Sequence, residues 1–266
     1  MANGDVSKLW TPSYKSPSLS FRLSRVCSRW TETVDTSFAD RVCLILCLIT
    51  GLCDSCAFNS WSCFLAMQTG NTIVLGLGAS QQPIGTPLGW ARSAVSISSF
   101  IAGAITFDRL TKALGVRRRG TLVISFGLQS TLIIIAAVLI QINIIQKQDE
   151  RLFTSENPLL SLIPICLLAF QSAGSINSTR MLGFNEIPGV VLTSVYYDIA
   201  SDPGLFERPS RNIKRNRRIG GVVMLLMGAI IGGWLSRSKG GMGLVLWIAA
   251  SLKLCISAGW LFWPHA

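Results

Sequence analysis

The chain has 266 residues, of which 50% are hydrophobic and only 14% are charged, and its mean hydropathy is +0.48. Because a soluble domain carries about 25% charged residues, this composition excludes an ordinary soluble protein and predicts a multi-pass membrane protein. The net charge of +11 does not indicate nucleic-acid binding, since no basic stretch is interleaved with base-stacking aromatic residues.

The first forty residues are rich in Ser and in basic residues, and they contain no apolar core of a signal peptide. We interpret 1–40 as a disordered cytosolic tail and 41–266 as a single membrane domain. A mitochondrial transit peptide is the alternative, but the acidic residues of this segment weaken it, because such peptides are poor in acidic residues.

Six apolar runs are long enough to cross a membrane as helices of about 20 residues. They cover 42–58, 90–107, 120–141, 159–177, 219–235 and 242–263. Two further apolar segments look interrupted, because 61–79 is broken at Thr69-Gly70-Asn71 and 187–199 is too short to span. The predicted fold is therefore an all-α polytopic membrane protein with about six transmembrane helices and two broken or re-entrant segments.

The stretch 41–80 holds the clearest candidate site. Asp54 lies where the first transmembrane helix is still buried, and a carboxylate in lipid is costly unless it faces a cavity or a partner. The polar run Gln68-Thr69-Gly70-Asn71-Thr72 interrupts the next apolar segment, as expected of a discontinuous helix whose free backbone groups bind a solute or ion. A pair of slightly polar spanning helices with no site is the alternative.

Other polar residues within the apolar runs extend this candidate site. Gln171 and Thr193 lie in the second half of the chain, and Lys253 lies within the last span. Asp54 and Lys253 each follow about 16–18 Å of helix, and opposite charges at similar depth are cheaper together than apart. We therefore predict that they pair. Arg92, near the start of its span, is expected to snorkel to the membrane surface.

The distribution of charge predicts the topology. If both interrupted segments re-enter rather than span, 18 of the 24 Lys and Arg residues fall on one side, in the N-terminal tail, 108–119 and 178–218. This excess predicts that side, with both termini, to be cytosolic. Each half then consists of a span, a broken segment and two spans, in opposite orientations, which predicts a 3+3 inverted repeat. The plasma membrane or an endomembrane is the favoured location.

Cysteine chemistry and catalysis are not expected. Most of the eight Cys lie in apolar runs, where they are interpreted as small packing residues. A soft-metal site of Cys43, Cys47 and Cys53 is the alternative, and we expect no metal or other cofactor. The sequence holds no HExxH or Gly-x-Ser-x-Gly motif, no paired carboxylates within a span, and no His base for a Cys nucleophile. We therefore do not expect an enzyme.

Two motifs resemble a known family. Gly51-Leu52-x-Asp54 and the run from Met67 to Thr72 are similar to the Gly-x-x-Asp and Met-Thr-Gly-Asn motifs of the YoaK-like family of predicted multi-pass membrane proteins. The resemblance extends from about Asp40 to Trp263. That family is a domain of unknown function, so the resemblance supports the architecture and implies no established substrate.

The chain departs from the family pattern in two places. Gln68 separates Met67 from Thr69, and Thr193-Ser194 stands where a Thr-Gly pair is usual. The second departure weakens the expectation of a glycine break in the second half. Gln171 falls where the family has a polar patch, and the basic tail resembles a eukaryotic, fungal-type extension.

These observations favour a secondary transporter or permease of a small solute or ion. Asp54 would couple transport to a proton or cation, and the segment from Thr69 to Thr72 would offer polar groups to the substrate. The alternative is a non-catalytic scaffold or assembly factor, or a channel-like pore. The expected partners are the lipid bilayer and a small solute or ion, without nucleic acid. Assembly into a homo-oligomer stays open.

Overall fold

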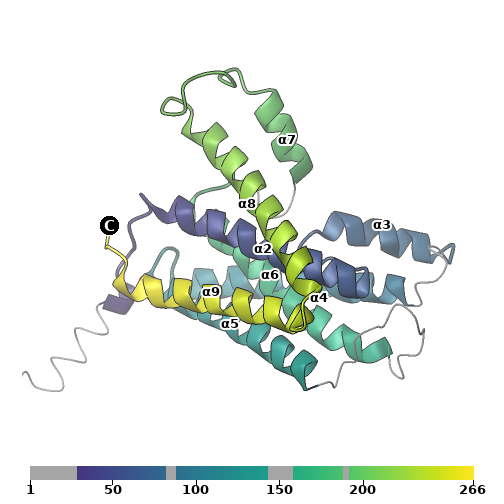
Figure 1. The fold of residues 1–266 in the computed structure, drawn as a ribbon. Helices are drawn as coiled ribbons and strands as arrows, with labels where there is room; N and C mark the ends of the chain where they lie inside the picture. Colours follow the sequence, from purple (N-terminus) through teal and green to yellow (C-terminus); the bar gives the residue numbers. More distant parts are fainter. Residues whose placement is uncertain (1–28, 82–87, 143–157, 188–191) are drawn as a thin grey trace, which may run out of the picture.

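The computed structural model describes residues 29–81, 88–142, 158–187 and 192–266. Most of the predicted disordered tail, and Pro188-Gly189, therefore lie outside the described residues. Within the described ranges the regular elements are helices (Figure 1). These are α2 (Ala39–Trp61), α3 (Gln68–Gly78), α4 (Gly89–Leu114), α5 (Arg119–Gln141), η1 (Pro158–Ser161), α6 (Leu162–Leu182), α7 (Leu192–Ala200), α8 (Ile213–Ser236) and α9 (Gly241–Phe262).

The long helices confirm the prediction of a polytopic membrane protein. Five of the described helices, α2, α5, α6 with η1, α8 and α9, are long and apolar enough to cross a membrane. The sixth predicted span, α4, has 26 residues and so measures about 39 Å, which exceeds the hydrocarbon thickness of about 30 Å. It is less apolar than the others because it carries small residues and charged residues near both ends.

The two interrupted segments form short helices. Helix α3 has 11 residues and α7 has 9, so they are about 16 Å and 14 Å long. Neither reaches across a hydrocarbon core of about 30 Å. The break in the first segment is not at Thr69-Gly70-Asn71, as predicted, but at residues 62–67, which precede α3.

Basic segments from distant parts of the chain meet at one end of the bundle. The Arg117 carbonyl oxygen accepts a 3.0 Å hydrogen bond from the Val34 amide, and the Arg117 guanidinium donates to the Met181 carbonyl oxygen at 3.0 Å. Arg217 forms an ion pair with Asp40 at 3.2 Å, and the C terminus lies nearby (Figure 1). We call this end, formed by 29–40, 115–119, 183–187, 213–218 and 261–266, the basic end. The connection 201–212 stands away from it, at the tip of the arm formed by α7 and α8 (Figure 1).

The helix contacts have the pattern of an inverted repeat. Exchanging α2 with α6, α3 with α7, α4 with α8 and α5 with α9 converts the α2–α8 contact into α4–α6 and the α3–α4 contact into α7–α8. The same exchange converts α5–α6 into α2–α9 and α4–α5 into α8–α9, while α5–α9 and α2–α6 are unchanged. Helix α2 begins at the basic end and α6 ends there (Figure 1), so the two halves have opposite orientations.

Glycines allow equivalent close approaches in the two halves. A Cβ added at Gly228 of α8 would collide with the backbone oxygen of Leu48 in α2. A Cβ added at Gly103 of α4 would likewise collide with the backbone oxygen of Phe170 in α6. Gly232, one turn after Gly228, also lies against the α2 backbone. Gly228-x-x-x-Gly232 is therefore a close-packing motif, because only residues without a Cβ let these backbones approach so closely.

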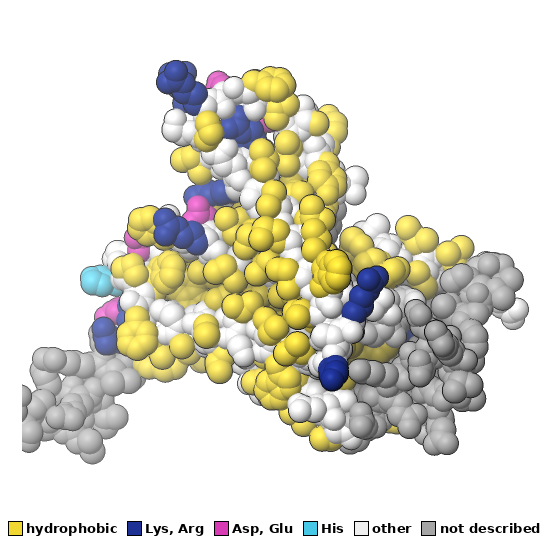
Figure 2. All heavy atoms as spheres, in the orientation of Figure 1, with side chains coloured by type: hydrophobic (Ala, Val, Ile, Leu, Met, Phe, Trp, Pro, Cys, Tyr) yellow, Lys and Arg dark blue, Asp and Glu magenta, His cyan; other side chains and the backbone are white. Residues whose placement is uncertain are grey.

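The outer surface is mostly apolar between the ends of the helices (Figure 2). On α8 the side chains of Leu226, Ile230 and Trp234 are 57%, 52% and 71% exposed, which suits contact with lipid. The α7–α8 connection is polar instead, and there the Asn212 side-chain amide donates to the Asp202 carboxylate at 3.0 Å. This hydrogen bond lowers the pKa of the Asp202 carboxyl below its ordinary value.

Candidate functional site

Asp54 organises the break between α2 and α3. Its carboxylate Oδ1 accepts hydrogen bonds from the backbone N–H groups of Leu65 and Ala66 at 2.8 and 2.9 Å, and its Oδ2 accepts from Met67 at 3.2 Å. Asp54 lies seven residues before the end of α2. The chain therefore turns back after α2 by about 10 Å, and α3 starts again at the depth of Asp54.

The turn at the end of α2 has local and distant causes. Ser62 adopts the left-handed conformation, with φ 52° and ψ 36°, and its N–H donates to the Phe58 carbonyl oxygen, which ends the helix. The next residues lack helical backbone hydrogen bonds, and in lipid such groups need other partners. Three partners come from Asp54, and others come from α3, α4 and α6.

Asn71 and Ser96 hold the middle of this loop. The Asn71 side chain, which is 0% exposed, accepts from the Phe64 N–H at 3.0 Å and donates to the Phe64 carbonyl oxygen at 2.7 Å. Ser96 of α4 donates to the same carbonyl oxygen at 2.7 Å. On α6, Ser172 donates to the Leu65 carbonyl oxygen at 2.9 Å. The loop is thus an irregular segment whose backbone bonds to side chains from four helices.

A second polar cluster surrounds Lys253 of α9. The Lys253 side chain is 1% exposed, and its Nζ donates to Gln129 Oε1 at 2.7 Å, Gln171 Oε1 at 2.6 Å and Ser175 Oγ at 2.8 Å. An ammonium group has three N–H donors, so these three oxygens from α5 and α6 satisfy all of them. All three acceptors are uncharged, so the buried positive charge has no counter-ion within this cluster.

Asp54 and Lys253 line the same small cavity, but they do not form the predicted ion pair. The cavity has a volume of about 10 Å³ and is also lined by Thr50, Gln171 and Ser175. This is roughly the space that one water molecule needs. Among the ion pairs of the described residues there is none between Asp54 and Lys253. Backbone N–H groups of the loop bind the Asp54 carboxylate instead, and three neutral oxygens take all three donors of the Lys253 ammonium.

The structure brings only some of the predicted site residues together. Asp54, Gln171 and Lys253 share the cavity, and Asn71 holds the adjoining loop. The side chains of Thr69 and Thr72 are exposed, and Thr72 donates to the Gln68 carbonyl oxygen within its own helix. Thr193 is exposed on α7, which contacts α8.

Gly70 does not break the helix. It lies in the first turn of α3, and its missing side chain makes room for the ring of Phe64, whose nearest carbon would be 2.8 Å from an added Cβ. The Phe64 ring stacks in turn on Phe58 with centroids 4.6 Å apart. Gly70 therefore lets the loop fold back against α3, and the proposed backbone deviation at this residue was wrong.

Arg92 was expected to snorkel and is instead buried, with 5% exposure. Its guanidinium donates to the Trp61 carbonyl oxygen and to Ser161 Oγ, both at 3.3 Å, so it connects the end of α2 to the start of α6. Arg92 and Arg217 each lie eleven residues before the equivalent glycines, Gly103 and Gly228, so they correspond in the repeat. Arg217 pairs with Glu186 at 3.0 Å.

Gln129, Ser175 and Ser96 were also missed as site residues, because a single uncharged polar residue in a span gives little signal.

The cysteines of α2 pack in the core. Cys43, Cys47 and Cys53 are at most 3% exposed. No group of three or more His, Cys, Asp or Glu side chains in the described ranges is placed to hold a metal ion.

These features define an α-helical multi-pass membrane protein in which side chains stabilise a discontinuous segment after the first transmembrane helix. Residues 42–259 match the model of a family described as "Protein of unknown function (DUF1275)". Because the match covers most of the chain, the protein belongs to this family, and the resemblance drawn from its motifs is confirmed. No curated protein and no solved structure gives a significant match to the chain.

Proposed function

We propose that the protein is a secondary transporter of a small solute, with the cavity between Asp54 and Lys253 at its centre. The observation that carries the proposal is the helix contact pattern, which is unchanged when the two halves of opposite orientation are exchanged. Inverted repeats with discontinuous helices near mid-membrane are a common architecture of secondary transporters, because such halves can rock about a shared central site.

The chemistry of the central cavity supports the same proposal. Ionisable residues within a membrane are expensive and usually serve a function. Lys253 has only neutral partners in the described residues, and Asp54 holds a loop that has no helical hydrogen bonds of its own. A solute or proton that changes the charge of this cavity would weaken the bonds from Asp54 to the loop and so open the segment 62–67.

The cavity is too small for a solute in the conformation described, with about 10 Å³. In the proposed mechanism this conformation is an occluded one, and binding requires α3 and its loop to move away from α2. Asp54 acts as the coupling group, and Lys253 with Gln129 and Gln171 supplies the charge and hydrogen bonds that a solute meets.

Uptake into proteoliposomes tests the proposal. Purified protein is screened by thermal shift against amino acids, organic acids, sugars and nucleosides, and stabilising compounds are then used as radiolabelled uptake probes. The wild type is expected to show saturable uptake. Asp54→Asn is expected to insert and to lose uptake, whereas Asp198→Asn, at an exposed carboxylate that pairs with Arg218, is expected to retain it.

Two outcomes contradict the proposal. Conductance that rises linearly with solute concentration and needs no coupling gradient indicates a pore. Absence of both uptake and conductance in wild-type protein of intact fold, across the whole set of probes, indicates a scaffold or assembly factor.

A further inference from the structure

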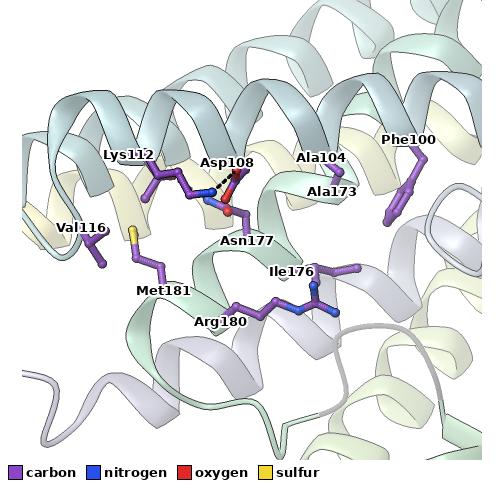
Figure 3. Close-up of a pocket in the computed structure, with 11 residues that line it drawn as sticks. Phe100, Ala104, Asp108, Lys112, Val116, Ala173, Ile176, Asn177, Arg180 and Met181 are labelled. Atoms are coloured by element: carbon purple, nitrogen blue, oxygen red, sulfur yellow. Dashed lines mark hydrogen bonds and ion pairs between the residues drawn. The ribbon is translucent and has the colours of Figure 1, made fainter.

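A larger pocket lies between α4 and α6, apart from the central cavity (Figure 3). Its volume is about 480 Å³, which falls within the range of about 300–1,000 Å³ of small-molecule sites. It opens on the outer surface of the bundle, because Ala104, Lys112, Val116 and Arg180 on its wall are all exposed. We call it the α4–α6 pocket.

The α4–α6 pocket is apolar at one end and charged at the other. Phe100, Ala104 and Ile176 line the end that lies towards the middle of the two helices, whereas Lys112 and Arg180 lie two residues before the ends of α4 and α6. These helix ends belong to the basic end. From Phe100 to Lys112 the helix rises about 18 Å, close to half of a hydrocarbon core of about 30 Å.

The charged end of the pocket has an excess positive charge. Lys112 and Asp108 form an ion pair at 2.7 Å, which neutralises both of them. In Figure 3 the side chain of Arg180 runs away from Lys112, and its guanidinium lies on the side of Ile176. It has no ion pair among the described residues. A guanidinium presents a planar fork of donors that fits a phosphate or carboxylate.

We propose that the α4–α6 pocket binds an anionic phospholipid from the leaflet at the basic end, with the headgroup phosphate at Arg180 and an acyl chain along Phe100 and Ile176. Basic pockets between transmembrane helices bind lipid headgroups of this kind. The inner end lies along two membrane-crossing helices and beside exposed Ile101 and Ile105. A lipid reaches this end by lateral diffusion, whereas a water-soluble anion would have to leave water. This site is independent of the proposed transport function.

Native mass spectrometry of purified protein in a neutral detergent tests the proposal, with phosphatidylserine, phosphatidylglycerol and phosphatidylcholine as the lipids added. The wild type is expected to retain the two anionic lipids in preference to phosphatidylcholine. Arg180→Gln is expected to weaken their retention by about tenfold, as typical of a lost charge-assisted hydrogen bond. The matched control is Arg109→Gln, which removes an exposed charge on α4 that does not line the pocket.

A second variant tests the apolar end of the pocket. Ala104→Trp fills the space beside Phe100 from an exposed position, so it should fold normally and lose the anionic lipids as well. Equal weakening by Arg180→Gln and Arg109→Gln would show non-specific attraction and overturn the proposal. Stabilisation of lipid-free protein by sodium octanoate, abolished by Arg180→Gln while the phospholipids have no effect, would also overturn it, because the site would then take soluble organic anions.

Discussion

Single side chains carry the two opposite charges at the centre of the bundle, and each has its own set of partners. The Asp54 carboxylate accepts three backbone N–H groups of the loop, so its charge stabilises a turn that the apolar sequence Ser62–Met67 would not form alone. The Lys253 ammonium is held by three neutral oxygens. Hydrogen bonds to charged groups are worth about 1.5–3 kcal/mol each, so these bonds offset the cost of burying the two charges without a direct ion pair.

Separate partners predict that the effects of neutralising Asp54 and Lys253 add. In Asp54→Asn, the amide –NH₂ would face the N–H of Met67, or those of Leu65 and Ala66, so that donor meets donor. In Lys253→Met, the Gln171 side-chain oxygen would lose its donor. Each variant should lower the melting temperature in detergent, by an amount that reflects about 1.5–3 kcal/mol. The double variant should lose nearly the sum, because the two side chains share no hydrogen-bond partner, and the departure from additivity measures the coupling across their shared cavity.

The exposed pair Asp108 and Lys112 supplies the control for this cycle, since the side chains are 50% and 70% exposed. Such i,i+4 pairs contribute about 0.3–0.5 kcal/mol, so Asp108→Asn and Lys112→Met should scarcely change the melting temperature. Recovery of stability in the Asp54→Asn/Lys253→Met double variant would instead mean that the two charges pair directly.

At the scale of elements, the sequence predicted the helices better than it predicted the break. The apolar runs, separated by charged or Pro/Gly-rich segments, predicted the positions of all six long helices. They could do so because lipid requires continuous helices of near-constant length. The break was assigned to Gly70 from its flexibility, but the helix ends at Trp61 and restarts at Gln68. The residues between are mostly apolar. Ser62 ends the helix, and the loop that follows is held by the Asp54 carboxylate, which lies eleven to thirteen residues before the N–H groups that it binds.

The polar cluster around Lys253 was only partly predictable for a related reason. Lys253, Asp54 and Gln171 stood out, because charges and amides are rare in apolar runs. Which oxygens meet the ammonium depends on the contact of α9 with α5 and of α5 with α6, and the hydropathy pattern does not fix those helix neighbours. Arg92 illustrates the same limit of sequence-based prediction. Its position near the start of a span suggested that it snorkels, but neighbouring helices bury it.

The approach of α8 to α2 gives a prediction for a pair of elements. Gly228→Ala should force the two backbones apart, because the added Cβ would meet the Leu48 carbonyl oxygen, and overpacking of this kind costs about 1–3 kcal/mol. Gly233→Ala is the matched control, since nothing lies within 4 Å of its Cβ position. It should leave the melting temperature unchanged or raise it slightly, because Ala is the better helix former. Similar melting temperatures for the two variants would contradict the packing described.

At the scale of the whole molecule, the inverted repeat explains why the two halves share contacts and differ in chemistry. The first half places a carboxylate at Asp54, and the second half has Asn177 at the matching position of Gly174-x-x-Asn177. Asn177 does not organise a loop, since it donates to Thr111 Oγ1 at 2.7 Å. The first half therefore has a charged residue that binds a loop, Asp54, where the second half has a neutral residue in a helix contact, Asn177. Only the first half contributes an acidic group to the central cavity.

The arrangement of the helices predicts where introduced labels become accessible. Because α3 is too short to cross, Gln81 and Ser238 should lie on one side of the membrane, and Lys214 with Val116 on the other, at the basic end. The excess of Lys and Arg at the basic end predicts that this side is cytosolic. In a background with the native Cys replaced, Cys at Gln81 or Ser238 should react with a membrane-impermeant maleimide on intact cells, and Cys at Lys214 or Val116 only after permeabilisation. Labelling at positions 81 and 214 from the same side would mean that α3 and its loop span the membrane. The reversed pattern at all four positions would be consistent with the fold but would overturn the assignment of the basic end to the cytosol.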